Sequence, residues 1–442
     1  MSLLDSWKSP KYVLAPMVDG SELAWRMLGR KYGVQLTFTP MINSTSFLVN
    51  KKYRHSCLQF ASEDRPIIVQ FCANSPDTFI KCAKLVQPFC DAVDLNLGCP
   101  QGIAKKGHYG AFLQDEWDCL KHIISRASSE LSVPVTCKIR IFSDVDRTVQ
   151  YAKLLEAAGA SMLTVHGRTR EMKGQKTGLA DWNQIRAVKE AVKIPVIANG
   201  NIQYLSDVHR CLDSTKADAV MSAEGHLHNP ALFSGIQPCV YDMCFEYLNF
   251  VEKYPTSLPI IRGHIFKLCH YSLDEHPEYR SLLGSSQSAE GIKEILQKMA
   301  NHCSSCTVNS SNVLPHPHWL CQPYERPITF PVQENLEIST QTVSGELNFQ
   351  ATDKNEPTKK VMLTEQRRSR KALKKEAKLA KKLAIIDGKL ICTSCNKNRK
   401  SVNCVRLVCR PCCQNQTGSN LNSQANILCP LHYRQMNAVL SD

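Results

Sequence analysis

The sequence predicts a (β/α)8 TIM barrel, a ring of eight parallel strands that alternate with helices. Short apolar runs recur between residues 12 and 225, and the stretches between them are long enough for a crossover helix. Most runs are continuously apolar and β-branched, which is typical of parallel strands covered on both faces. Eight strand–helix units also fit the roughly 250 residues of such a barrel.

The predicted strands follow one another at even spacing. They are "YVLAPMV", "QLTFTPM", "IIVQFC", "AVDLNLG", "VTCKIRI", "MLTVHGR", "VIANGNI" and "AVMSAEG". Two of the segments between them, residues 75–89 and 145–160, show the helical period, and Gly159 is suited to end the second helix. We assign residues 1–237 to this barrel.

Beyond the barrel the strand signal stops. Residues 238–300 contain the helical patterns "YDMCFEYLNFVEKY", "IIRGHIFKLCHYSL" and "AEGIKEILQKMA", which predict a small helical domain. Residues 301–357 lack periodicity and predict a largely disordered linker. The histidines and cysteines between residues 302 and 321 are irregularly spaced, which argues against a metal site there.

Two further segments complete the chain. Residues 358–388 predict a basic helix that ends at Gly388, with an apolar stripe of Leu373, Ala377, Ala380 and Ala384. Residues 389–442 hold two C-x2-C pairs separated by 13 residues, close to zinc-ribbon spacing. We expect one zinc ion on Cys392, Cys395, Cys409 and Cys412. The candidates for a second ion are Cys413, Cys429 and His432.

Charge is distributed unevenly along the chain. Of the 54 lysines and arginines, 18 lie after residue 357, against 4 of the 40 acidic residues, so residues 358–442 carry the whole net charge of +14. A neutral body with a basic appendage predicts contact with a polyanion, most often nucleic acid. A solvated basic helix or a nuclear-import signal is the alternative.

Composition also indicates the compartment. The first residues, "MSLLDSWKSP", show no signal-peptide pattern, and the chain has no run of about 18 apolar residues that would cross a bilayer. Cytosolic reductants keep thiols unpaired, so we expect the 21 cysteines to be free thiols, metal ligands or catalytic groups. We therefore expect a soluble, intracellular monomer in the cytoplasm, the nucleus or both.

The residues at the C-terminal ends of the predicted strands, where barrels of this kind carry their chemistry, are unusually polar as a group. Each has a structural explanation taken singly, but so many at one rim predict an active site. They are Pro16, Met17, Gln70, Asn96, Cys99, Lys138, Arg140, His166, Arg168, Asn199, Gly200, Asn201, Ala223, Glu224 and Gly225.

The turns after the last two strands, "ANGN" and "SAEG", predict a phosphate site. Small residues let backbone N–H groups approach a phosphate, which such barrels commonly bind at this place. The reactive end of the cofactor would then extend toward the lysine and histidine of the rim. These two residue types suit a flavin, because a cation or strong donor stabilises the negative charge of its reduced form. FMN, with one terminal phosphate, fits this layout.

Six motifs resemble those of the tRNA dihydrouridine synthases, most of all the eukaryotic class that acts on positions 16 and 17 of the tRNA D-loop. They are "APMVDGSELAWR", "DLNLGCPQGIAKKGHYGAFL", "CKIR", "TVHGRTR", "IPVIANGNI" and "AEGHLHNPALF", in the family's order between residues 10 and 300. The resemblance implies an FMN barrel, a helical tRNA-binding domain and NADPH as electron source. It implies the reduction of uridine in tRNA to 5,6-dihydrouridine.

The resemblance also assigns residues. Cys99 matches the family's proton donor. The residues that match its FMN contacts are Pro16, Met17, Val18, Gln70, Lys138, His166, Asn199, Gly200, Asn201, Ala223, Glu224 and Gly225. Asn201 stands where bacterial members usually have aspartate, and Glu224 where many have arginine. The phosphate must then rest on backbone N–H groups and on Arg168 or Arg170.

A single thiol at the rim has a chemical purpose in that reaction. Hydride addition at C6 of uracil leaves an enolate that needs a proton at C5, and a thiol is mostly protonated at neutral pH. We expect Gly98 to let the backbone come close to the cofactor or base, and the basic loop after Cys99 to grip phosphates around a flipped nucleotide. The candidate substrate-binding residues are Asn96, Lys105, Lys106, Arg140, Arg168 and Arg170.

Two alternatives stay open. In an aldolase-type barrel, Lys138 would form a Schiff base with a carbonyl substrate. In a catalytically silent protein, the barrel and the zinc module would serve as an RNA-binding scaffold. Flavin absorbance of the purified protein distinguishes a flavin-dependent reductase from both.

Overall fold

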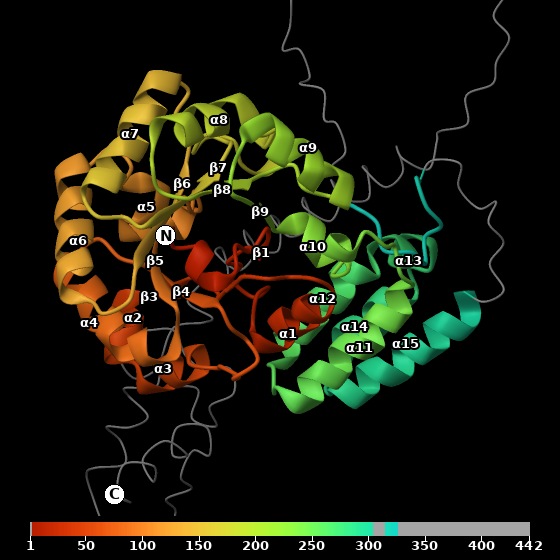
Figure 1. Ribbon diagram of the computed structural model, residues 1–442. Helices are drawn as coiled ribbons and strands as arrows, with labels where there is room; N and C mark the ends of the chain where they lie inside the picture. The colour runs from red at the N-terminus through yellow and green to blue at the C-terminus, as the bar shows by residue number, and fades with distance from the viewer. Residues whose placement is uncertain (1, 304–313, 326–442) are drawn as a thin grey trace, which may run out of the picture. The chain divides into compact units, whose positions relative to one another are not determined.

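Parallel strands form a near-closed barrel in the computed structural model, which describes residues 2–303 and 314–325 (Figure 1). The strands are β1 Tyr12–Leu14, β2 Thr37–Phe38, β3 Ile42–Asn43, β4 Ile67–Cys72, β5 Ala92–Leu97, β6 Val135–Arg140, β7 Met162–His166, β8 Val196–Asn199 and β9 Ala219–Ser222. Their order is β1-β9-β8-β7-β6-β5-β4-β2, and β3 pairs with β4. The backbone N–H of Leu14 donates to the carbonyl of Leu36 at 3.0 Å, which brings β1 back beside the start of β2. The predicted barrel and its eight strands are confirmed.

Helices connect the strands and surround them (Figure 1). Those of the barrel are α1 Leu23–Lys31, α2 Ser44–Val49, α3 Lys51–Cys57, α4 Pro76–Val86, α5 Gly102–Gly107, α6 Trp117–Glu130, α7 Val145–Ala157, α8 Trp182–Ala191, α9 Leu205–Thr215 and α10 Glu224–His228. Short 3-10 helices span Asp5–Trp7, Gln87–Phe89, Gly110–Phe112, Gly174–Lys176 and Leu232–Ser234. The predicted end of α7 is confirmed, because Gly159 has φ +108°, a conformation that glycine tolerates.

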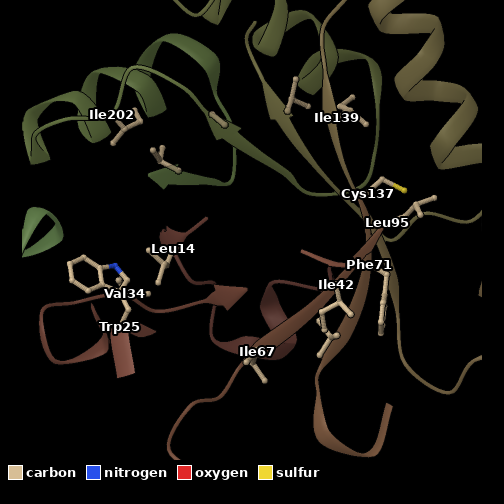
Figure 2. Close-up of a cluster of buried hydrophobic side chains, with 14 of the residues drawn as sticks. Leu14, Trp25, Val34, Ile42, Ile67, Phe71, Leu95, Cys137, Ile139 and Ile202 are labelled. Carbon is tan, nitrogen blue, oxygen red and sulfur yellow. The ribbon is translucent and has the colours of Figure 1, made fainter. Parts of the chain in front are cut away.

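Apolar side chains cover both sides of the barrel wall. On the outer side, Leu14, Phe71 and Leu95 belong to a large buried cluster that includes helix residues such as Phe79 of α4 (Figure 2). Inside the barrel lies a second cluster, which contains Val13, Leu36, Phe38, Ile68, Ala92, Met162, Ile197, Ala219 and Met221. Burial on both faces explains why the strands read as continuous apolar runs.

The inward positions become polar toward the C-terminal ends of the strands. On β4, apolar Ile68 is followed two residues later by Gln70, and on β8 Ile197 is followed by Asn199. Because alternate residues of a strand share a face, these polar side chains also point into the barrel. The apolar cluster therefore closes the lower part of the barrel and leaves a polar rim above it.

Among the residues that the structure describes, the helices α11 to α15 follow the barrel (Figure 1). They are α11 Val240–Lys253, α12 Leu258–Leu268, α13 His270–Glu275, α14 Tyr279–Ser285 and α15 Ala289–Cys303. The three helical patterns seen in the sequence form helices, and the second of them is divided between α12 and α13 at Cys269. Trp25 of α1 stacks on His264 of α12 with ring centroids 3.9 Å apart, so a buried aromatic contact joins the helices to the barrel.

Residues 314–325 fold against these helices, although we expected them within a disordered linker. The N–H of Val240 donates to the carbonyl of Trp319 at 2.8 Å, and the hydroxyl of Ser272 donates to the carbonyl of His318 at 2.8 Å. The expectation was wrong for this stretch because its contacts are long-range bonds to the main chain, which leave no periodic pattern in the sequence.

The remaining segments lie outside the described residues. They include most of the expected linker, the basic helix predicted over residues 358–388, and the zinc module predicted over residues 389–442. The zinc assignment to Cys392, Cys395, Cys409 and Cys412 therefore stays a prediction. Among the residues with described positions, no helix is long and apolar enough to cross a membrane.

Candidate active site

The structure brings the polar residues of the strand ends together at one rim. Backbone pairing places Asn96 of β5 opposite Lys138 of β6. It also aligns Arg140 of β6, His166 of β7 and Asn199 of β8 in one row. Because parallel strands end on the same side of a barrel, these side chains surround a common space at its mouth.

A directed chain of hydrogen bonds runs from the Cys99 backbone into the barrel. The N–H of Cys99 donates to Oδ1 of Asn96 at 2.9 Å, and Nδ2 of Asn96 donates to Oε1 of Gln70 at 2.9 Å. Nε2 of Gln70 donates to Oδ2 of Asp94 at 2.8 Å, while the hydroxyl of Thr136 donates to Oδ1 of Asp94 at 2.7 Å. An ionised carboxylate only accepts, so Asp94 fixes the direction in which both amides face.

Sequence reasoning did not single out Asp94, which is fully buried. Burial raises the pKa of Asp94 to about 6, so the side chain is mainly a carboxylate at neutral pH. In the sequence, Asp94 is a single polar residue in an apolar strand. Its spacing from Asn96 could have revealed it, because residues two positions apart on β5 share the same face of the strand.

The loop that carries Cys99 is fixed by its neighbours. The N–H of Ala111 donates to the carbonyl of Cys99 at 3.1 Å, and Nε of Arg140 donates to the carbonyl of Gly98 at 2.8 Å. Gly110 has φ +65°, and a Cβ there would lie 2.8 Å from the carbonyl oxygen of Cys99. A Cβ on Gly98 would meet nothing closer than 3.4 Å. The loop itself therefore requires glycine at Gly110, while the close approach of Gly98 to a cofactor or base stays a prediction.

Arg170 and Lys173, which follow β7 in the chain, also bind the loop that carries Cys99. Arg170 donates from Nη1 to the carbonyl of Ala111 at 3.2 Å and to Oδ2 of Asp115 at 2.8 Å. Lys173, which sequence reasoning did not single out, donates to the carbonyl of Pro100 at 2.6 Å. Arg170 was a candidate for substrate or phosphate binding. Its Nε and Nη1 bind the protein, as the nitrogens of Arg168 also do, and its predicted role stays a prediction.

Lys138 is the cation of the inner rim. Its Nζ donates to Oδ1 of Asn199 at 3.0 Å, and Nδ2 of Asn199 donates to the carbonyl of Met221 at 3.0 Å. Burial, and then the charge of Arg140, lowers the pKa of Lys138 to about 8. The ammonium form of Lys138 therefore predominates at neutral pH and is lost as the pH rises above this value.

His166 is a neutral group beside these cations. Burial, followed by the charges of Lys138 and Arg140, holds the pKa of His166 well below its ordinary value. Nη1 of Arg168 lies 3.0 Å from Nε2 of His166, and a guanidinium only donates, so the ring proton is on Nδ1. Arg168 also donates from Nη2 to Oδ1 of Asn201 at 2.6 Å.

The turns after β8 and β9 are tightly built. Gly200 has φ +120°, and a Cβ there would lie 2.6 Å from Cβ of Ala180. A Cβ on Gly225 would lie 2.3 Å from the carbonyl oxygen of Ile202. Protein atoms fill the space beside both glycines, so neither turn has room for a side chain. The phosphate site that we predicted at these turns stays a prediction.

The other predicted residues lie at the edge of the rim. Pro16, Met17 and Ala223 are half-buried, whereas Val18, Lys105, Lys106 and Glu224 are exposed. Lys105 and Lys106 belong to the short helix α5 rather than to the loop that we expected. Their exposure leaves both ammonium groups accessible to a large anionic substrate.

Fold and site together define a TIM-barrel protein with a hydrogen-bonded, cationic rim at the C-terminal ends of its strands. A family profile described as "Dihydrouridine synthase (Dus)" matches residues 13–346. The chain therefore belongs to the dihydrouridine synthase family, whose members are flavin-dependent oxidoreductases. This membership decides against the aldolase and against the silent scaffold.

Curated relatives agree with this assignment. The chain is 45% identical over 414 residues to a Mus musculus protein named tRNA-dihydrouridine(16/17) synthase-like, which covers 91% of this chain and 84% of the mouse protein. It is 42% identical to the Saccharomyces cerevisiae tRNA-dihydrouridine(16/17) synthase, over 74% of this chain and 86% of the yeast protein. A Homo sapiens relative named for positions 20a and 20b is 39% identical over 57% of this chain and 80% of its own length.

Proposed function

We propose that this protein reduces uridine to 5,6-dihydrouridine at positions 16 and 17 of the tRNA D-loop, with FMN as cofactor and NADPH as electron donor. The observation that carries the proposal is the hydrogen-bond chain that holds the Cys99 loop at the rim occupied by Lys138. The proposal also draws on two relatives, 45% and 42% identical, whose names specify positions 16 and 17 and NAD(P)(+).

The residues present fit a flavin with a single phosphate. The ammonium of Lys138 and the amide of Gln70 are suited to hold the isoalloxazine ring. The turns at Gly200 and Gly225, which exclude side chains, and the guanidinium of Arg168 are suited to hold the phosphate. This donor set contains a cation for the ring and a separate one for the phosphate, as FMN requires.

The protein's own part in the reaction is the delivery and control of one proton. When bound, the flavin supplies the hydride that reaches C6 of uracil. Cys99 gives its thiol proton to C5, and the thiolate regains a proton from solvent. The ammonium of Lys138 stabilises negative charge at the rim, while the chain through Asn96 and Gln70 holds the Cys99 loop at a fixed place.

The test of the catalytic assignment is Cys99→Ala. We expect this variant to keep its flavin and its oxidation of NADPH, while dihydrouridine formation falls roughly 10²- to 10⁴-fold, the usual contribution of a general acid. Cys119→Ala is the matched control, because Cys119 is also a partly buried free thiol but belongs to α6. Wild-type product formation by Cys99→Ala would remove Cys99 from this role.

The position assignment needs a separate experiment. Dihydrouridine is mapped in tRNA from cells that lack the protein and from the same cells after its gene is restored. We expect positions 16 and 17 to lose the modification and to regain it on restoration. Loss confined to positions 20a and 20b would instead place the chain with the less similar relatives.

A further inference from the structure

Three side chains with metal-binding atoms converge at one end of the helical segment. His276 directly follows α13, Cys303 is the last residue of α15, and His318 lies in the stretch 314–325. Their exposed fractions are 9%, 7% and 6%, so all three are buried. Sγ of Cys303 lies 2.9 Å from Nε2 of His318 and 3.7 Å from Nε2 of His276, and the three atoms lie within 4.8 Å of one another.

We infer that His276, Cys303 and His318 bind a zinc ion. One thiolate and two neutral imidazoles are the ligand types that zinc prefers, and three protein ligands leave a fourth position for water or another group. With Zn–S of about 2.3 Å and Zn–N of about 2.0 Å, tetrahedral geometry separates S and N by about 3.5 Å. The distance of 3.7 Å from Cys303 to His276 is already close to this value, and that to His318 must widen by roughly 0.6 Å on this geometry.

Neighbouring groups orient these ligands as they do in metal sites. The hydroxyl of Tyr241 donates to Sγ of Cys303 at 3.2 Å and so fixes the position of the sulfur. Oε1 of Glu278 lies 3.8 Å from Nδ1 of His276, the ring nitrogen that does not contact Cys303. The hydroxyl of Ser272 donates to the carbonyl of His318 and fixes the backbone of that ligand.

A metal at this site would help to hold residues 314–325 against the helices. In this stretch only Leu320 pairs with another segment in a β-bridge, to Cys239. A metal bound by His318 and by the ends of α13 and α15 would cross-link that stretch to two helices. His276 lies 27 residues before Cys303, outside the range of residues 302–321 in which irregular spacing argued against a metal site. The inference is independent of the flavin and of the proposed reaction.

The first experiment measures bound metal in the full-length protein. Because the tail is also expected to bind zinc, we use a background in which its seven cysteines are replaced by serine; they are Cys392, Cys395, Cys404, Cys409, Cys412, Cys413 and Cys429. We expect this protein to retain one equivalent of zinc and, after exchange into Co²⁺, to show thiolate-to-cobalt charge-transfer absorption. A background protein that holds no zinc and takes up no Co²⁺ overturns the inference without any variant at the site.

The second experiment assigns the ligands in the same background. Cys303→Ser and His318→Gln should each lose the equivalent of zinc and the charge-transfer band. Cys321→Ser is the matched control, since Cys321 is fully buried in the same stretch but does not belong to the cluster, and it should retain both. A chelator should lower the midpoint of thermal unfolding of the background protein and leave that of Cys303→Ser unchanged. Retention of the zinc by Cys303→Ser, or equal loss in Cys321→Ser, contradicts the assignment.

Discussion

The carboxylate of Asp94 is the last acceptor in the chain that begins at the Cys99 backbone, which makes its charge more important than its size. Asp94→Asn removes the charge and one of the two acceptors, so the new amide can accept from Nε2 of Gln70 only if its NH2 group faces Thr136 and the Thr136 hydroxyl accepts instead of donating. A hydrogen bond to a charged group contributes about 1.5 to 3 kcal/mol, so we expect dihydrouridine formation at saturating tRNA to fall roughly 10- to 100-fold. The KM for tRNA should not change.

Thr136→Val is the control for this prediction. It removes the donor at the other oxygen of Asp94 but leaves the direction of the Gln70 and Asn96 amides as it is. We expect a clearly smaller loss of rate, measured under the same single-turnover conditions. Equal losses in the two variants would mean that burial of Asp94, and not the direction of its hydrogen bonds, sets the rate.

The lowered pKa of Lys138, about 8, gives the rate of flavin reduction a pH dependence of definite sign. Below this pH the ammonium is present, and above it the charge that stabilises the rim is lost. The rate of flavin reduction by NADPH should therefore fall as the pH rises through about 8, and Lys138→Ala should be slow, or poor in flavin, throughout. Lys138→Arg keeps its charge at all these pH values, so its falling limb should move upward. If the falling limb of the pH profile does not move in Lys138→Arg, the fall in rate comes from another titrating group.

Some residues of the candidate site could be predicted from the sequence and others could not. Cys99 and Asn96 were visible because they end an apolar run at a predicted rim. Asp94 and Gly110 were not, since the importance of Asp94 depends on a partner in another strand and that of Gly110 on a carbonyl 2.8 Å from its missing Cβ. Such relations are set by the register between strands, which a single sequence does not record.

At the scale of elements, two acidic residues join α1 to α11 in contrasting environments. Glu22 is buried, and its oxygens lie 2.7 Å from the hydroxyl of Tyr247 and 3.0 Å from Nε2 of His264. Glu246 of α11 lies nearer the surface and accepts from the hydroxyl of Tyr32 at 2.6 Å. The pair allows a test of what burial adds to an otherwise similar contact.

Glu22→Gln should lower the free energy of unfolding by about 1 to 3 kcal/mol, because the amide has one acceptor oxygen in place of two and one of the two buried hydrogen bonds must reverse or be lost. Glu246→Gln should change it by less than about 1 kcal/mol, as is usual for contacts near the surface. Denaturant unfolding of both variants measures the difference. Equal effects would show that the buried cluster does not hold the helices on the barrel.

The contribution of Glu22 also has a definite pH dependence. Burial alone would raise the pKa of Glu22, but the charge of His264 and the hydrogen bonds from His264 and Tyr247 outweigh it, so the folded-state pKa is lowered. The carboxylate therefore stabilises the fold above its unfolded pKa of about 4.3, and this stability is lost as the pH falls through the lowered value. Wild type and Glu22→Gln should converge in acid.

Elements were predictable where their pattern is local. The strands were recognised from apolar runs and α7 from its period and its terminal glycine, because burial on both faces and the helical turn impose those patterns. The stretch 314–325 was not recognised, since main-chain bonds to Val240 and Ser272 hold it in place. The pairing of β3 with β4 was missed as well, because two residues are too few to show a pattern.

At the scale of the whole molecule, charge separates the part that reacts from the part that we expect to hold tRNA. Residues 1–357 contain 36 basic and 36 acidic residues, whereas residues 358–442 carry a net charge of +14. A polyanion is attracted over the distance of a Debye length, about 8 Å at physiological salt, so the tail should raise affinity without altering chemistry on bound substrate.

Truncation before Thr358 should therefore raise the KM for tRNA and leave single-turnover reduction at saturating tRNA near wild type. A full-length variant tests the charge itself, with glutamine in place of the lysines at the centre of the basic segment, Lys371, Lys374, Lys375, Lys378, Lys381 and Lys382. Each phosphate contact contributes about 0.7 to 0.9 to the slope of log K against log salt, so six lost contacts would flatten it by about 4 to 5. If truncation and neutralisation both leave affinity and slope unchanged, the basic segment serves localisation or protein docking, and the helices between residues 240 and 303 must grip the tRNA with the barrel alone.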